Sequence, residues 1–178
     1  MRAVAIGMLL IVAGCSDTGG AEKEKAKAAA APEAGQWEVA SEVTAFRAMD
    51  NGEPKINTPQ GTRTAEAICV GAGEGGRPDP ALFAGADYEC QYGDYYMRNG
   101  RMNLTMQCTR ESMPGTIGIT VEGTFQGSEF AVNRTIDTSL TSDGDVQITS
   151  RLTGRRSGAC QPGAAEGNAQ GNAAGNAS

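Results

Sequence analysis

The chain has 178 residues, a length that predicts one folded domain with additional segments at its ends. It contains 15 Lys and Arg, 21 Asp and Glu and no His, so its formal net charge is −6. The absence of His excludes a Ser-His-Asp triad, a Cys-His pair and any His-bound zinc site. The acidic balance argues against a nucleic-acid-binding surface, which requires a basic patch. The 25 Gly residues and the aromatic content of 5% favour a turn-rich β domain over a helical bundle.

Residues 1–14 have the features of an export signal. Arg2 supplies a positive charge, and residues 3–13 form an uncharged, mostly apolar run that is too short to span a bilayer. The run ends in Val12-Ala13-Gly14-Cys15, which resembles a bacterial lipobox, the motif at which lipoprotein signal peptidase cleaves before an acylated cysteine. We therefore expect Cys15 to be the lipidated N-terminus of the mature protein. The alternative is an ordinary secretory signal in which Cys15 stands by chance.

The residue that follows the predicted lipidated cysteine indicates in which membrane the protein is held. In enteric bacteria an Asp at this position marks retention in the inner membrane, so Ser16 favours the outer membrane, on the side that faces the periplasm. Two or more acyl chains hold a protein stably at a membrane, whereas one does so only marginally. The sequence thus predicts a bacterial cell-envelope protein whose partner is the membrane, through its N-terminal lipid.

The segments that flank the domain lack residues that could build a core. Residues 16–34 contain no Ile, Leu, Val or aromatic residue, so we expect residues 15–34 to be a flexible tether. Residues 161–178 repeat Gly, Asn and Ala with a period of four and are predicted to be disordered. The foldable part is then residues 35–160.

Alternation with a period of two runs through that part of the chain. Trp37, Val39, Val43 and Ala45 alternate with polar residues and predict a half-buried strand. A turn-rich loop at residues 47–61 precedes a second predicted strand at 62–70. Residues 79–83 favour a short helix, with Asp79 as its N-cap and a Pro at its first position.

Residues 90–96 and 102–108 predict a hairpin, and two independent features indicate the same register. A three-residue loop at 98–100 places apolar residues opposite apolar residues, with Tyr96 facing Met102. The same register sets Cys90 opposite Cys108. A two-residue turn at 99–100 would instead set apolar faces against polar ones.

Two further hairpins complete the predicted fold. A two-residue turn at 127–128 pairs Phe125 with Phe130, and a loop at 142–144 pairs Leu140 with Val146. Strands that are joined by hairpins, each with one polar face, indicate an all-β protein. We expect an antiparallel meander barrel or sandwich of about seven or eight strands with one short helix, two disulfides and disordered tails.

The cysteines predict the two disulfides. Four remain when Cys15 is set aside, and an even number in an oxidising compartment indicates two bridges. The hairpin register selects Cys90–Cys108, which leaves Cys69–Cys160. A zinc site is disfavoured because the chain has neither His nor a CxxC spacing, and we expect no metal and no other cofactor.

Two motifs at the ends of residues 35–160 carry a family resemblance. The opening Gly35-Gln36-Trp37-Glu38-Val39 and the closing Gly154-Arg155-Arg156-Ser157-Gly158-Ala159-Cys160, with the cysteines between them, resemble domain of unknown function 3617. This family is common among exported proteins and lipoproteins of proteobacteria. The resemblance implies an envelope location and this fold, and it implies no chemistry.

Two charged residues fall on the apolar side of predicted strands. Asp94 shares a face with Tyr92 and Leu104, and Arg134 shares one with Val132. An inward charge is costly unless it is paired, so the two lie at a solvent-accessible rim, pair with each other, or anchor a ligand in a small pocket. Some inward positions are small or polar and could line such a pocket. They are Ser41, Gly123, Thr138 and Ser150.

These observations leave three hypotheses for the activity. The first is a non-enzymatic binding or structural module of the envelope, with an envelope protein as a possible partner. The second is a carrier of a small amphipathic ligand in the barrel interior, with Asp94 and Arg134 as ligand-binding residues. The third, which we rank below the others, is a hydrolase that uses carboxylates such as Asp94, Glu122 or Asp137.

Overall fold

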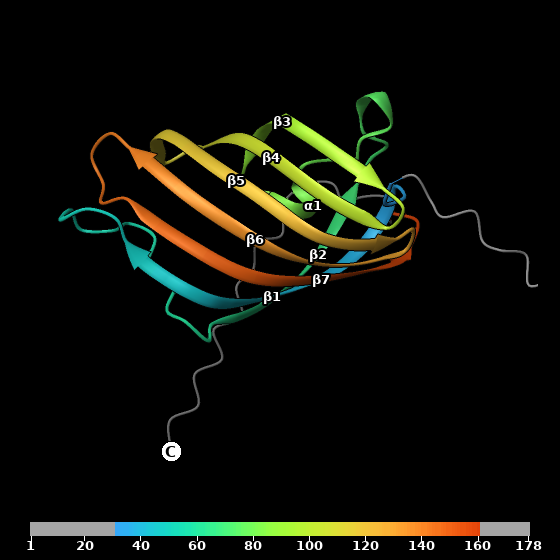
Figure 1. The fold of residues 1–178 in the computed structure, drawn as a ribbon, viewed down its shortest axis with the longest axis horizontal. Coiled ribbons are helices and arrows are strands. Elements are labelled where there is room, and N and C mark those ends of the chain that lie inside the picture. The colour runs from blue at the N-terminus through green and yellow to red at the C-terminus, as the bar shows by residue number, and fades with distance from the viewer. Residues whose placement is uncertain (1–30, 161–178) are drawn as a thin grey trace, which may run out of the picture.

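The computed structural model describes residues 31–160, and all of their strands belong to one antiparallel sheet. The sheet has seven strands in the order β2-β1-β7-β6-β5-β4-β3, so the all-β prediction is confirmed (Figure 1). The strands are β1 (Gly35–Ala48), β2 (Arg63–Val70), β3 (Glu89–Arg98), β4 (Arg101–Arg110), β5 (Met113–Gln126), β6 (Glu129–Leu140) and β7 (Val146–Gly158). The chain also forms a 3-10 turn η1 (Glu74–Gly76) and a short helix α1 (Ala81–Ala84). Strands β3 to β7 form a meander, and β1 then pairs with β7.

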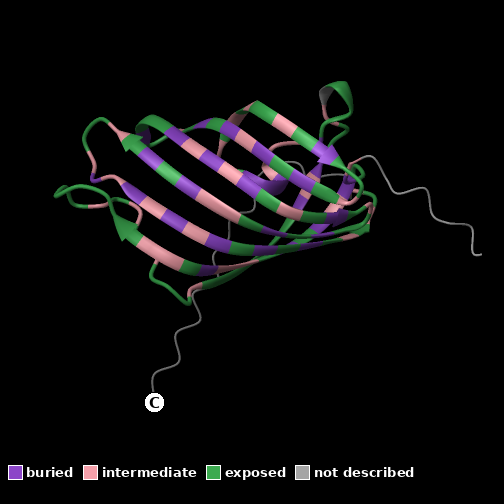
Figure 2. Cartoon of the chain, in the orientation of Figure 1, coloured by how far each residue is buried: buried purple, intermediate pink, exposed green. Residues whose placement is uncertain are grey.

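One face of the sheet is buried and the other meets solvent. Buried and exposed residues alternate along the strands, as Figure 2 shows. The sheet is strongly curved around α1 (Figure 1). We call the face whose buried side chains pack against α1 the inner face. The core on this face includes Trp37, Leu104, Ile117, Ile119, Val121, Phe125, Phe130, Ile148 and Leu152. Side-chain alternation alone therefore predicted most of the core correctly.

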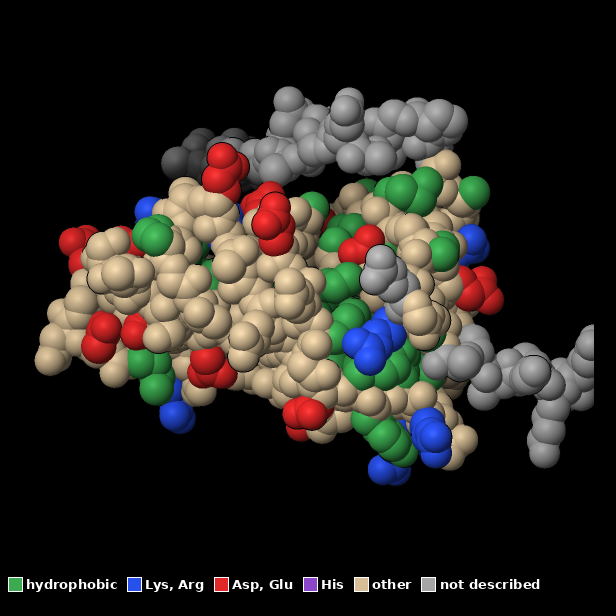
Figure 3. Space-filling view, turned by 90° about the horizontal axis from the view of Figure 1, so that it is seen from above, with side chains coloured by type: hydrophobic (Ala, Val, Ile, Leu, Met, Phe, Trp, Pro, Cys, Tyr) green, Lys and Arg blue, Asp and Glu red, His purple; other side chains and the backbone are tan. Residues whose placement is uncertain are grey.

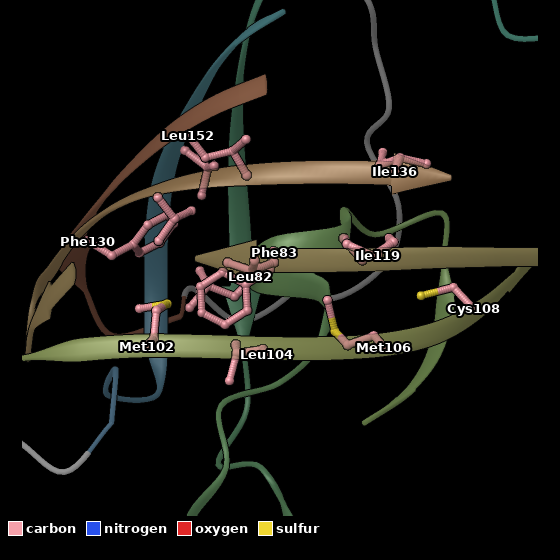
Figure 4. Close-up of a cluster of buried hydrophobic side chains, with 14 of the residues drawn as sticks. Leu82, Phe83, Met102, Leu104, Met106, Cys108, Ile119, Phe130, Ile136 and Leu152 are labelled. Carbon is pink, nitrogen blue, oxygen red and sulfur yellow. The ribbon is translucent and has the colours of Figure 1, made fainter. Parts of the chain in front are cut away.

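A strap joins the two edges of the sheet. We use this name for residues 71–88, which connect β2 to β3 and carry α1. Leu82, Phe83 and Ala84 of α1 are 1%, 0% and 2% exposed, because they cover apolar side chains of the inner face (Figure 4). Asp79 Oδ1 accepts a hydrogen bond from the Ala81 backbone N–H at 2.9 Å at the start of α1, although Pro80 and not Asp79 occupies the N-cap position.

The β3–β4 hairpin differs from its prediction. Asn99 and Gly100 form a two-residue turn with φ values of 52° and 73°, a conformation whose twist suits a hairpin. The register at Cys90 and Tyr92 is nevertheless the predicted one, because a bulge at Gly93-Asp94 adds one residue to β3. Beyond the bulge the faces exchange, so the predicted pairing of Tyr96 with Met102 is wrong. Met97 faces the core instead, and Tyr96 is 51% exposed.

The next two hairpins show one confirmed register and one correction. Phe125 pairs with Phe130 and Ile119 with Ile136, as predicted. Leu140 does not pair with Val146, because the β6–β7 ladder is shifted by two residues. The Asp145 carboxylate accepts a hydrogen bond from the Leu140 N–H at 2.7 Å and thereby replaces a partner strand at the end of β6. A shift of two residues keeps the same side chains on the inner face.

Both predicted disulfides are present. Cys90 is bonded to Cys108 between neighbouring strands, and Cys69 is bonded to Cys160, which joins the end of β2 to the segment after β7. The sequence separations of 18 and 91 residues correspond to about 3 and about 4 to 5 kcal/mol in the loop-entropy model. The two bridges hold β2, after which the strap begins, and β3, before which it ends.

Several predictions concern residues outside the described range. These are the signal at 1–14, the lipidated Cys15, most of the tether at 15–34, and the tail at 161–178. Residues 31–34, at the end of the predicted tether, contact the domain: the Glu33 N–H donates to the Gly127 carbonyl at 3.3 Å. None of the helices among the described residues is long and apolar enough to cross a membrane.

Candidate functional site

Arg134 lies on the inner face of β6, beneath the strap. Its Nη1 donates to the carbonyl oxygens of Phe83 and Ala84, at 3.0 and 3.4 Å, so the guanidinium holds the C-terminal end of α1. The carbonyl end of a helix attracts a cation. Burial lowers the pKa of Arg134, and the nearby Tyr88 and Glu66 partly offset this effect. Arg134 Nε is buried and has no hydrogen-bond partner among the described residues.

Ser150 stands beside Arg134 on the neighbouring strand. The two residues are opposite each other in the β6–β7 ladder, and both belong to the inward-facing series of their strands. Directly opposed residues have Cβ atoms about 4.5–5.5 Å apart. Ser150 is 1% exposed, and its Oγ also has no partner among the described residues. We call Arg134 and Ser150 the inner polar pair, because both carry an unused hydrogen-bonding group in an apolar surrounding.

Asp94 does not belong to this site. It lies in the β3 bulge and is exposed, so the sequence expectation that it shares the inner face with Arg134 is wrong. Its backbone N–H donates to Thr105 Oγ1 at 2.8 Å. The extra residue in the bulge changes the direction in which the side chain points, and nothing in the alternation of β3 predicts it. Arg134 therefore binds carbonyl oxygens of α1, whereas pairing with Asp94 was one of the predicted alternatives.

Aromatic residues of β3 fasten the strap at its other end. Tyr92 Oη donates to the Pro78 carbonyl at 2.9 Å, and burial raises the pKa of this phenol. The Arg77 guanidinium lies 5.9 Å from the ring centre of Tyr92 and 5.2 Å from that of Tyr95, within the range of a cation–π interaction. This cluster was not predicted from the sequence, because no local spacing connects Arg77 with residues 15 and 18 positions later.

A broad hollow of about 880 Å³ lies across five strands, from β2 to β5. Its lining includes small residues such as Ala40, the aromatic residues Phe125 and Phe130, and the acidic residues Glu38, Glu66 and Glu129. Glu129 forms an ion pair of 3.0 Å with Arg155, and both side chains are largely exposed. An exposed ion pair of this kind contributes little to stability. The hollow could not be found from the sequence, because it depends on the order of the strands.

The three carboxylates that a hydrolase was expected to use do not come together. Asp94, Glu122 and Asp137 lie on β3, β5 and β6, and all three are exposed. Glu122 accepts a hydrogen bond from Asn103 Nδ2 at 3.0 Å, and Asp137 accepts one from Gln147 Nε2 at 2.7 Å. On the face seen from above, Figure 3 shows acidic and basic side chains dispersed, with hydrophobic side chains gathered near one end. Among residues 31–160, no three His, Cys, Asp or Glu are placed to hold a metal ion.

The two motifs that carry the family resemblance lie side by side in the structure. Trp37 on β1 pairs with Arg156 on β7, and Val39 pairs with Gly154. Trp37 Nε1 donates to the Glu33 carbonyl at 2.9 Å, and Arg156 Nε donates to the Ala34 carbonyl at 2.8 Å. Residues of both motifs therefore hold the segment that precedes β1 against the sheet.

Comparison with known proteins assigns the domain. The family model described as Protein of unknown function (DUF3617) matches residues 32–160, and the chain belongs to this family. No curated protein and no solved structure matches the chain. The fold and the inner polar pair therefore have to be interpreted from their own chemistry.

Proposed function

We propose that this protein is a lipid-anchored lipoprotein of the bacterial envelope, held in the outer membrane with its β domain in the periplasm. The disulfides are the observation that supports this most strongly, because all four cysteines of residues 31–160 are paired. Disulfides of this kind persist in oxidising compartments and are rare in the cytosol. The lipobox-like Val12-Ala13-Gly14-Cys15 then supplies the export signal and the acylation site.

Fractionation of cells that express the full chain tests the anchor. Wild-type protein is expected with the outer membrane and to incorporate labelled palmitate, whereas Cys15→Ser is expected to incorporate none and to remain unprocessed. Ser16→Asp should move the protein to the inner membrane in an enteric host, and Ser16→Ala serves as its control. A soluble, unlabelled wild-type protein would contradict the proposal.

The role of the domain in this proposal is non-enzymatic. Two classes of module fit: a binding or structural module that works through its surface, and a carrier that holds a small amphipathic molecule on its inner face. The inner polar pair favours the carrier, because an apolar interior that contains unused donors suits a ligand with an apolar body and a polar head. A hydrolase remains the third candidate, and the dispersion of Asp94, Glu122 and Asp137 gives it no support.

Identification of small molecules that co-purify with the protein tests the carrier hypothesis directly. Native mass spectrometry after mild extraction is expected to show the polypeptide with a bound lipid or metabolite, and Arg134→Ala is expected to lose it. Detection of the polypeptide without any adduct, in wild type and variant alike, would leave the surface module as the better hypothesis.

A further inference from the structure

The strap and the inner polar pair meet at one place on the inner face. Arg134 uses Nη1 to bind the strap, while its Nε and the Ser150 Oγ remain without partners among the described residues. We propose that these two groups bind the anionic head of a single-chain amphiphile, and that the acyl chain takes the place of Leu82 and Phe83 when the strap moves away. This inference deepens the carrier function proposed above and rests on it.

The chemistry of the pair selects an anionic oxygen. Arg134 Nε–H and the Ser150 hydroxyl can both donate, and a guanidinium presents its donors in a fork that matches a carboxylate or a phosphate. The residues that oppose the pair across the sheet, Val121 and Val43, are buried and apolar. Neither valine offers an acceptor. The acidic group that acts on Arg134 is Glu66, an exposed residue opposite Val39, and among the described residues it forms no hydrogen bond with the guanidinium. An incoming anionic head group would therefore be the acceptor for both unused donors, in competition with the charge of Glu66.

The strap already makes the two kinds of contact that such a ligand would make. Its carbonyl oxygens at Phe83 and Ala84 bind the guanidinium, and its side chains Leu82 and Phe83 lie against the apolar inner face. In Figure 4 these two side chains point from α1 into the space between Leu104 on one side and Phe130 and Leu152 on the other. An acyl chain with an oxyanion at one end could make the same two kinds of contact.

The arms of the strap allow it to move while its ends stay fixed. Residues Cys69 and Cys90 stand just outside the strap, and each is held by a disulfide. On the β2 side, a Cβ added at Gly71 or Gly75 would meet no atom within 4 Å, so these two positions face open space. This arm is held to β3 by the contacts of Arg77 and Pro78 described above, and these contacts must break when the strap moves. Gly75 has φ +64°, a conformation that glycine adopts without strain. The disulfides therefore limit the movement to the segment between them.

Binding of dansylaminoundecanoic acid, followed by fluorescence, tests the inference. The full chain carrying Cys15→Ser is used, since this change removes the predicted acylation site and leaves residues 31–160 unaltered. Arg134→Gln is expected to weaken binding about tenfold or more, and Ser150→Ala about threefold to tenfold. Thr149→Ala is the matched control, because Thr149 adjoins Ser150 on β7 but belongs to the opposite, outward-facing series of positions. It should leave the affinity unchanged.

Phe83→Ala gives a test of opposite sign. If the strap competes with the ligand, weakening it raises the fraction of open protein, so probe affinity should rise about tenfold although the domain becomes less stable. The gain must require Arg134, because a cavity left by the missing ring would not need a charged head. Unchanged or weaker binding by Phe83→Ala would overturn the role of the strap.

Competition identifies the head group. Decanoate, decyl phosphate and decanol have the same chain length, and each is added below its micellar concentration. Displacement by decanoate or decyl phosphate, with decanol much weaker, supports the proposal and shows whether the source is a fatty acid or a phosphate ester. Equal displacement by decanol, or failure of the wild-type domain to bind the probe, overturns it. Failure of the envelope proposal would appear separately, as wild-type protein in the soluble fraction.

Discussion

Gly154 lies where β7 passes beneath the ring of Phe130, and Gly154→Ala probes the packing at the motif end of the sheet. A Cβ at this position would lie 2.1 Å from Phe130 Cε1, far inside contact distance. The ring has little room to move, since its centre is 5.6 Å from that of Trp37 and 5.3 Å from that of Phe83. Overpacking of a filled core costs about 1–3 kcal/mol, and we expect a loss of unfolding free energy in this range.

Urea denaturation with the disulfides intact measures this loss. With a slope of about 2 kcal/mol per molar urea, a loss of 2 kcal/mol lowers the midpoint by about 1 M. Gly118→Ala is the matched control, because the nearest atom to its added Cβ is the Asp137 carbonyl oxygen at 3.7 Å, an ordinary contact. In a Phe130→Ala background, Gly154→Ala should cost little, so the double-mutant cycle should show coupling of about 1–3 kcal/mol. Equal effects of Gly154→Ala and Gly118→Ala would refute the reasoning.

Three further predictions concern the bridges, the strap and the corrected hairpin. Replacing Cys90 and Cys108 by Ala should cost about 3 kcal/mol, and replacing Cys69 and Cys160 about 4 to 5 kcal/mol; urea midpoints of the two double variants check this order. Because burial raises the pKa of Tyr92 in the folded state, the unfolded chain loses this proton first, so stability should fall as the pH rises above about 10. Tyr92→Phe should reduce that fall, and an unchanged pH profile would contradict the burial of the phenol. Asn99→Ala should destabilise the hairpin by about 1 kcal/mol, because Asn99 has positive φ, whereas Asn99→Gly should not; equal stability of the two would count against the two-residue turn.

Side-chain alternation predicts this fold well because one face of each strand must be buried. Trp37, Leu104 and Leu152 are all found in the core, and a register error of two residues at β6–β7 changes none of these assignments. The cysteines could also be paired from the sequence, since Cys90 and Cys108 oppose each other on either side of a short hairpin. Local periodicity is thus sufficient for the faces of strands whose alternation is unbroken, and it fails in β3 beyond the bulge.

The candidate site shows where such reasoning stops. The bulge that carries Asp94 out of the core depends on one additional residue, which the turn at Asn99 compensates, and alternation alone cannot locate it. Arg134 could be identified as an inward charge, yet its partner is the carbonyl end of α1, 50 residues earlier in the chain. Ser150 could be placed beside it only once the β6–β7 register was known. Contacts between polar groups that are far apart in the sequence can be identified only once the fold is known.

The central claim, a lipid-anchored envelope protein, can be tested directly at its N-terminus. Mass spectrometry of the N-terminal peptide of the protein purified from membranes reads both the cleavage site and the modification. We predict a peptide that begins at Cys15 and carries two or three acyl chains. A mature peptide that begins at another residue, or one in which Cys15 is unmodified, would contradict the account.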